Sequence, residues 1–175
     1  MKNDNELIKR YQNGSVGAFD ELVRRHLDEV YRFFIKFTND PMDAEDLAQD
    51  IFLKLYKSLK KFRFEAEFKT YLYRININAA NNYLRRNRWR KWLHLDESPE
   101  QIDDCPGVES DWTKKELWDA VAKLPKAQRI VVTMRVAQNM PHKDIATIIG
   151  KSVSSVKTNY HYGISQLKKQ LGNVR

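Results

Sequence analysis

The sequence predicts an all-α protein made of two small helical domains joined by a flexible acidic linker. Apolar residues recur every three or four positions in most segments, which is the spacing of one face of a helix. Glycines and prolines are scarce, six and five respectively, and fall mainly at apparent boundaries. No run of strict apolar–polar alternation indicates a strand.

Charge and composition narrow the class of partner. With 31 Lys and Arg against 23 Asp and Glu, the 175-residue chain has a formal net charge of +8, which favours nucleic acid or an anionic membrane as partner. The single cysteine, Cys105, excludes an internal disulfide framework and indicates a reducing compartment. The N-terminus is too polar for a signal peptide, and no apolar run approaches membrane-spanning length. We therefore expect a cytoplasmic protein with no membrane insertion.

Two helices are expected in the first 38 residues. A short apolar stripe, Leu7, Ile8 and Tyr11, ends at Asn13-Gly14, a typical C-terminal signal. Residues 18–38 then carry a wide apolar face. Its members are Phe19, Leu22, Val23, Leu27, Val30, Phe34 and Phe37. His26 lies beside arginines, so we expect it to be solvated.

A third helix is expected over residues 42–59, after turn residues at 39–41, with Asp43 as its cap. Four residues share its outer face, because positions three and four apart are neighbours on a helix. They are Asp46, Gln49, Asp50 and Leu53. A metal site would need a Glu-x-x-His pattern that this segment lacks, and a catalytic site would need a pocket, which one helix cannot show. A docking surface for a basic helix and a solvated face are both physically reasonable. The residues alone favour the solvated face.

The stretch from Lys60 to Lys91 interleaves aromatic residues with cations, a combination that suits unpaired nucleic acid. The alternative is an amphipathic helix with an aromatic core and a solvated basic face. Part of the stretch is core, because four apolar residues recur at helical spacing: Phe68, Leu72, Ile75 and Ala79. Packing leaves other residues unexplained, namely Phe62, Phe64, Asn78, Asn82 and the arginine run.

Residues 93–111 are acidic, contain prolines and glycine, and form the expected linker between a first domain at 1–92 and a second at 112–175. In the second domain, Ala146, Gly150 and Val156 have the spacing of a helix-turn-helix, in which glycine takes the turn conformation and valine fills the corner. Ser152 can cap the second helix. Its exposed face would carry Ser154, Ser155, Lys157, Thr158, Asn159, His161 and Tyr162. Such a helix reads DNA in the major groove, although an αα-hairpin for protein contact has the same pattern.

Two blocks of the sequence, taken in their order along the chain, resemble those of a known protein family. They are DAEDLAQDIFLKLYKSLKKFR with FKTYLYRI and NYLRR, then LPKAQRIVVTMR with DIATIIGKSVSSVKT. Together they resemble the extracytoplasmic-function (group 4) sigma factors of bacterial RNA polymerase over almost the whole chain. The resemblance implies a region 2-like helical bundle, a region 4-like helix-turn-helix and a threading linker between them. It implies a non-catalytic subunit that binds core polymerase, recognises −35 and −10 promoter elements and promotes strand opening.

The resemblance also implies roles for the candidate residues. Asp46, Gln49, Asp50 and Leu53 would dock on the coiled coil of the polymerase β′ clamp, and the second domain on the β flap. The −10 element would be contacted by Lys60, Lys61, Phe62, Arg63, Phe64, Tyr71, Arg74, Asn78, Asn82, Arg85, Arg86 and Arg88. Flipped bases would enter an aromatic or polar pocket, and arginines would hold phosphates. The exposed face of the recognition helix would read the −35 element. An anti-sigma factor is a further implied partner.

The chain departs from the family pattern at several of these positions. Phe64 stands where the family often has glycine, and Tyr71 where it often has tryptophan. Asn159 and Tyr162 stand where recognition helices commonly carry arginine. The residues leave two other functions open: a DNA-binding regulator that works without polymerase, and a protein that sequesters a partner without DNA. An enzyme is disfavoured, because we find no phosphate loop, metal-ligand cluster or nucleophile–base pair, and we expect no cofactor.

Overall fold

The structure is a computed structural model that describes residues 3–92 and 114–172. Within these residues every regular element is a helix, which confirms the all-α prediction. The elements are α1 (Asp4–Gln12), α2 (Val16–Thr38), α3 (Pro41–Ser58), the 3-10 turn η1 (Leu59–Lys61), α4 (Phe68–Trp92), α5 (Lys114–Ala122), α6 (Lys126–Ala137), α7 (His142–Ile149) and α8 (Val153–Gly172). The expected linker and Cys105 lie outside the described residues.

Local signals set most of the helix ends. Asn3 and Glu6 form a capping box at the start of α1, and Gly14, at φ 95°, follows the end of that helix. The expected cap of α3 was wrong. Asp40, not Asp43, caps this helix, and its carboxylate accepts a 2.9 Å hydrogen bond from the Asp43 amide. Pro41 occupies the first turn, where the missing amide hydrogen is harmless, so the helix begins earlier than expected.

The first half of the chain, α1 to α4, packs around phenylalanines of α2. Phe33, Phe34 and Phe37 are fully buried, and Phe33 stacks on Phe37 with ring centroids 5.8 Å apart. Of the four core residues predicted in the fourth helix, Phe68, Leu72 and Ile75 are buried, whereas Ala79 is half-buried. The buried face of α3 and η1 consists of Ala44, Leu47, Ala48, Ile51, Leu55 and Leu59.

The second half, α5 to α8, contributes to two apolar clusters. A small cluster of its own joins α5, α6 and α8 through Trp118, Val121, Leu124, Val132 and Leu167. The other buried apolar residues of the second half belong to the cluster of the first half. These are Ile130, Val131, Met134, Met140, Ile145, Ala146, Ile148 and Val156. The two halves therefore share one continuous apolar core.

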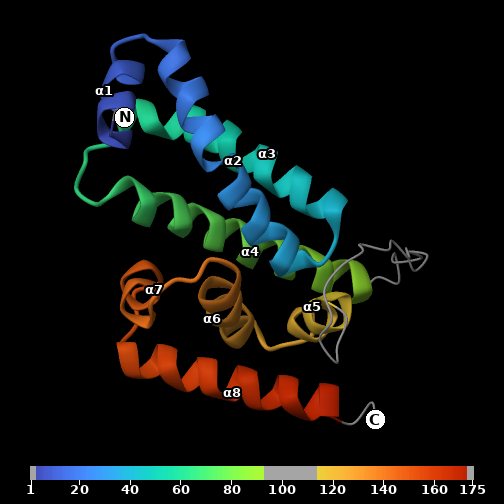
Figure 1. Cartoon of the computed structure of the whole chain (residues 1–175). Helices are drawn as coiled ribbons and strands as arrows, with labels where there is room; N and C mark the ends of the chain where they lie inside the picture. The colour runs from blue at the N-terminus through green and yellow to red at the C-terminus, as the bar shows by residue number, and fades with distance from the viewer. Residues whose placement is uncertain (1–2, 93–113, 173–175) are drawn as a thin grey trace.

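Helix α4 lies in the middle of the molecule. Figure 1 shows it between α2 and α3 on one side and α6 and α7 on the other, with α8 along the outer edge. Direct packing of α6 on α2 and of α7 on α4 was not anticipated from the sequence, which left the relative placement of the two halves open. This packing determines which surfaces of α4 are accessible.

Candidate functional site

The predicted outer face of α3 exists. Asp46, Gln49 and Asp50 are exposed, and Leu53 is 63% exposed. Gln49 and Leu53 also line a groove of about 660 Å³ between α2 and α3. The rest of the lining is largely apolar: Phe19, Val23, Leu27, Tyr31, Ala48, Phe52 and Tyr56, with Asp28 and Glu45. The geometry, an apolar groove beside carboxylates, suits an amphipathic helix that carries basic residues.

Sequence reasoning missed the contribution of α2 to this surface. Val23 and Leu27 were assigned to the wide apolar face of the second helix, and in the structure Val23 is half-buried and Leu27 is 44% exposed. The breadth of the apolar face of α2 was a signal for this second surface. A helix that packs against a core on a single side needs a narrower apolar stripe. Leu27 lines the groove, and Val23 lines it while also packing against the core.

The loop between η1 and α4 holds a cluster of three aromatic rings. The rings of Phe64 and Tyr71 each lie 5.0 Å from the ring of Phe62, centroid to centroid. The Gln12 side-chain amide braces the loop from α1 and donates hydrogen bonds to the carbonyls of Leu59 and Phe62, at 2.8 and 2.9 Å. All three rings are half-buried, so they form a preorganised aromatic platform on which a base could stack.

Phe64 has a left-handed backbone, with φ 60°. This conformation disfavours residues with a Cβ atom and suits glycine. It is also the position where the resemblance leads us to expect glycine. Phe64 therefore adopts a strained backbone conformation in this loop. Its ring packs in the aromatic cluster, and the Lys9 ammonium lies 5.5 Å from the ring centroid.

Helix α4 presents polar residues at intervals of four along one face. Arg74, Asn78 and Asn82 are exposed, as are the neighbouring cations Arg85, Arg86 and Arg88. Lys60, Lys61 and Arg63 are exposed in and beside η1. Arg74 is already bound: its guanidinium donates to the carbonyls of Thr147 and Ile148 in the last turn of α7, at 3.2 and 3.3 Å. The structure thus places Arg74, Asn78 and Asn82 along one face of α4 and engages Arg74 with the second half.

The helix-turn-helix has the predicted construction. Gly150 takes a left-handed conformation with φ 66° at the end of α7, Val156 is fully buried, and Ala146 is 5% exposed. The Ser152 hydroxyl caps α8 and accepts a hydrogen bond from the Ser155 amide at 3.1 Å. On the outer face, Ser154, Lys157, Thr158, His161 and Tyr162 are exposed, while Ser155 and Asn159 are half-buried.

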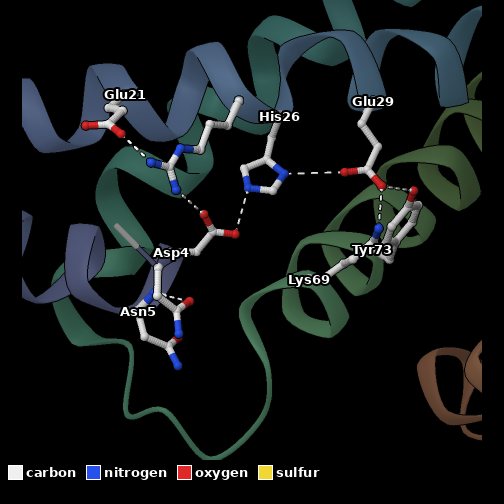
Figure 2. Close-up of polar contacts among 9 residues, drawn as sticks. Asp4, Asn5, Glu21, His26, Glu29, Lys69 and Tyr73 are labelled. Carbon is white, nitrogen blue, oxygen red and sulfur yellow. Dashed lines mark hydrogen bonds and ion pairs between the residues drawn. The ribbon is translucent and has the colours of Figure 1, made fainter. Parts of the chain in front are cut away.

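A polar network near His26 was missed by the sequence prediction. The expectation that His26 is solvated was wrong, because this residue is only 9% exposed. Its Nε2 lies 2.9 Å from a carboxylate oxygen of Asp4 in α1, and its Nδ1 lies 3.3 Å from Glu29 (Figure 2). Glu29 also accepts hydrogen bonds from Lys69 and Tyr73 of α4, at 3.0 and 2.8 Å. The network ties three helices together.

Two carboxylates on its two ring nitrogens require His26 to be doubly protonated. Burial acts to lower its pKa, but the hydrogen bond to Glu29 and the charge of Asp4 outweigh burial and raise the pKa of His26 above its ordinary value of 6.5. The hydrogen bond from His26, with help from Lys69 and Tyr73, lowers the pKa of Glu29 to about 2. Glu29, three residues after His26 on the same helix, was the one local signal for this cluster. Asp4 gave none, since it lies 22 residues away from His26.

Neither a metal centre nor a membrane span is found in the described ranges. No group of three or more His, Cys, Asp or Glu residues within 3–92 and 114–172 is arranged to hold a metal ion. None of the helices described combines the length and the apolar character needed to cross a bilayer.

The protein families that match this chain do so separately in its two halves. Residues 22–90 match the family described as Sigma-70 region 2, and residues 114–167 match Sigma-70, region 4. The chain is 30% identical to the RNA polymerase sigma-H factor of Pseudomonas aeruginosa, over 98% of this chain and 95% of that protein. It is 31% identical to the ECF RNA polymerase sigma-E factor of Haemophilus influenzae, over 89% and 88% of the two chains.

Solved structures share the fold. The structure of CnrH in complex with the cytosolic domain of CnrY superposes with a TM-score of 0.72 at 22% identity, covering 97% of each chain. The structure of the sigma factor RpoE in complex with the anti-sigma factor NepR from Bartonella quintana gives a TM-score of 0.70 at 20% identity, covering 91% of this chain and all of that one.

Proposed function

The chain belongs to the extracytoplasmic-function family of RNA polymerase sigma factors, and we propose that its recognition of promoters is divided among three surfaces. The α2–α3 groove binds core polymerase, the loop and the polar face of α4 that carries Arg74, Asn78 and Asn82 take the unpaired −10 strand, and α8 reads the −35 duplex. The chain itself is non-catalytic, because polymerase forms the phosphodiester bonds. It acts in the cytoplasm, where polymerase works.

The α2–α3 groove is the main observation that supports this assignment of functions to surfaces. Its apolar lining is open to solvent and is bordered by carboxylates, while Asp46, Gln49 and Asp50 lie exposed along its α3 side. The groove fits the coiled coil of the polymerase β′ clamp, which the family resemblance names as partner. It extends the docking surface from α3, as expected from sequence, onto Val23 and Leu27 of α2.

The −10 assignment is supported by chemistry at the loop and α4. A base that leaves the duplex stack loses its neighbours, and the rings of Phe62, Phe64 and Tyr71 offer replacement contacts worth roughly 1–3 kcal/mol per base. Asn78 and Asn82 supply amide donors and acceptors for base edges, and the arginines supply charge for phosphates. In the second half, Lys157, Thr158 and His161 project from the start of α8, as groove-reading residues do.

An anti-sigma factor is proposed as a regulatory partner. The solved complex of RpoE with NepR is one between a sigma factor and such a protein, and this chain shares its fold. Affinity purification of the tagged chain from its own cells, followed by mass spectrometry, tests this proposal. Recovery of polymerase subunits alone, under both resting and stressed growth, would count against it.

The decisive experiment combines the chain with purified core polymerase from the same bacterium and maps transcript starts on genomic fragments. Discrete start sites that require the chain are expected. Asp50→Lys should weaken polymerase binding at least tenfold, whereas Asp20→Lys, an equal charge change at an exposed site of α2 outside the groove, should not. DNA binding without polymerase binding would instead indicate an independent regulator.

Asn78→Ala separates the two functions of the first half. This variant should bind polymerase normally, because Asn78 lies outside the groove, and should open promoters about tenfold less well, since one base contact is lost. Permanganate reactivity of unpaired thymines measures opening. Equal damage to polymerase binding by Asn78→Ala and Asp50→Lys, with both variants folded, would refute the assignment of surfaces.

A further inference from the structure

Helix α1 lies beside the segment that leads from α3 to the aromatic platform of Phe62, Phe64 and Tyr71. Figure 1 shows α1 at the end of the molecule where α3 gives way to the loop before α4. The match to Sigma-70 region 2 begins at residue 22, so α1 precedes the matched residues. A role for this helix must therefore come from its own contacts.

The last residue of α1 holds the loop by its backbone. The Gln12 side-chain amide donates hydrogen bonds to the carbonyls of Leu59 and Phe62, at 2.8 and 2.9 Å. A side-chain amide nitrogen carries two hydrogens, so both are used. The Phe62 carbonyl belongs to the peptide bond that follows the first ring of the platform. Gln12 therefore fixes the backbone from which the Phe62 ring projects.

The loop needs support from outside, because it has no regular hydrogen-bonded structure. Residues 62–67 lie outside the helices of the described chain, and Phe64 among them has a left-handed backbone with φ 60°. A residue with a Cβ atom keeps such a conformation only where its surroundings over-determine it. The two hydrogen bonds from Gln12 and the contact between the Phe62 and Phe64 rings supply this constraint.

Helix α1 can support the loop because α1 itself is anchored to α2. The Asp4 carboxylate, at the start of α1, pairs with Arg25 at 3.1 Å and with His26 at 2.9 Å; Figure 2 shows the bond to His26. In the middle of the helix, Leu7 and Ile8 are fully buried in the core. The position of the C-terminal end of α1 is thus determined by contacts along the rest of the helix.

Packing alone accounts for Tyr11 but not for Gln12. Tyr11 is 5% exposed, and its hydroxyl donates a 2.6 Å hydrogen bond to the Tyr56 carbonyl in the last turn of α3, one of the carbonyls that a helix end leaves free. Gln12 is half-buried, and an apolar residue would fill its space equally well. The two loop carbonyls explain why an amide stands there.

Lys9 adds a cation at the edge of the platform. This residue is exposed on α1, and its ammonium lies 5.5 Å from the centroid of the Phe64 ring. A base that stacks on the platform brings its own phosphates close to the rings. The lysine ammonium, with three donors on a flexible stem, suits contact with such a phosphate.

We infer that α1 is part of the −10 site: Gln12 is a positioning residue that fixes the aromatic platform, and Lys9 contacts a phosphate of the strand bound there. This inference rests on the proposed function and deepens it, because it adds a helix outside the matched residues to the −10 surface. Gln12 acts through the loop and touches no base. Ordering the platform before the strand arrives lowers the cost of binding.

Fluorine NMR of the full-length chain tests the positioning role. With 4-fluorophenylalanine in place of Phe62, we expect one narrow resonance. Gln12→Met keeps the length of the side chain and removes both donors, so the resonance should broaden or split. Gln170→Met, the same change at an exposed site of α8, should leave it narrow. An unchanged resonance in Gln12→Met would overturn the positioning role.

Rescue by a second donor distinguishes hydrogen bonding from bulk. Gln12→Lys replaces the amide with an ammonium that can reach the same carbonyls, and it should restore the narrow resonance. Asn13→Lys added to Gln12→Met supplies the same charge at the next, exposed position and should not restore it. Equal spectra for these two variants would show that the hydrogen bonds of Gln12 do not order the loop.

Promoter opening measures the consequence for function. Holoenzyme made with Gln12→Met, on a promoter found by mapping transcript starts, should open about fivefold less well, because the platform is competent in only part of the population. Polymerase affinity should stay unchanged, since the α2–α3 groove does not include Gln12. Permanganate reactivity and a binding titration give the two values. A general structural defect would lower both, and normal opening would overturn the inference.

Salt dependence tests Lys9. The probe is a fluorescein-labelled single strand that spans the −10 element of the same promoter, bound by holoenzyme. Lys9→Gln should reduce the slope of log affinity against log salt by about 0.7, as expected for one lost phosphate contact. Arg10→Gln, an equal charge change at the next exposed residue of α1, should leave the slope unchanged. Equal slopes for the wild type and both variants would refute the phosphate contact.

The outcomes separate this inference from the proposed function. A chain that directs initiation, and whose Gln12→Met and Lys9→Gln variants behave as the wild type, keeps the sigma role and loses the role of α1. A chain that never directs initiation loses the proposed function and the −10 role of α1 with it, while the fluorine resonance still decides whether Gln12 orders the loop.

Discussion

The two halves of the molecule differ in the size of the apolar core that each forms from its own helices. The first half surrounds Phe33, Phe34 and Phe37 with apolar residues from four helices, and polar bonds at His26 tie α1 and α4 to α2. The second half has a small cluster around Trp118 and places its remaining buried residues in the core of the first. The half with the α2–α3 groove draws most of its core from its own four helices, and the half with the helix-turn-helix takes part of its burial from its neighbour.

The largest expected effects come from one substitution made in each half. Leu55 in α3 is 1% exposed within the large core, and Leu167 in α8 is 5% exposed within the small one. Leu55→Ala should lower the free energy of unfolding by about 4 kcal/mol and Leu167→Ala by about 2 kcal/mol, because a cavity costs more where surrounding side chains cannot relax. Urea unfolding followed by circular dichroism measures both. A larger loss at Leu167 would reverse the comparison.

The network at His26 should contribute next. Its pKa is raised in the folded protein, so its stabilisation is present below the unfolded value of 6.5 and is lost as pH rises through the folded value. His26→Gln should cost about 2 kcal/mol at pH 6, typical of hydrogen bonds to charged groups. The loss should shrink by pH 9. Urea midpoints across this pH range are the measurement, with exposed His161→Gln as control; a constant loss would exclude the ionised pair.

Two glycines should respond to alanine with opposite signs. A Cβ atom on Gly163 of α8 would lie 2.8 Å from Cγ2 of Val132 in α6, whereas one on Gly17 of α2 has open space. Gly163→Ala should therefore lower stability by about 1 kcal/mol through overlap, and Gly17→Ala should raise it by up to about 1 kcal/mol through helix propensity. Thermal unfolding tests the pair. Adding Val132→Ala should remove the overlap and rescue Gly163→Ala in part.

The smallest expected effect is at Phe64. Phe64→Gly removes left-handed strain of about 1 kcal/mol and loses a ring contact with Phe62 of similar size, so the net change in stability should stay below about 1 kcal/mol. Promoter opening should nevertheless fall, because the aromatic platform loses a ring. Urea unfolding and permanganate reactivity report the two effects. A large loss of stability would show that the ring serves the fold.

Periodicity predicted those parts of the structure that depend on neighbours along the chain. The inward faces of α3 and α4 follow from residues three and four apart, and the helix-turn-helix follows from Ala146, Gly150 and Val156. The position of Asp46 and Gln49 on one exposed face follows in the same way. These features are local, so one sequence contains their cause.

Contacts between distant segments could not be predicted in this manner. His26 was assigned to solvent because arginines flank it in sequence, and its partner Asp4, on another helix, could not be anticipated. Arg129, whose guanidinium donates to the Phe37 carbonyl, lies 92 residues from Phe37, and nothing near either residue indicates the other. The predicted start of α3 was wrong for a simpler reason. Asp40 and Asp43 are both suitable caps, and only Pro41 distinguishes them.

The shared core has a consequence for the order of synthesis. The ribosome completes α1 to α4 before α6 and α7 exist, and the remaining 83 residues take roughly 4 to 17 seconds at 5–20 residues per second. During that interval the nascent chain holds a complete α2–α3 groove and an uncovered inner face of α4. Each newly made molecule therefore offers both surfaces to the cell before its own C-terminal half can cover one of them.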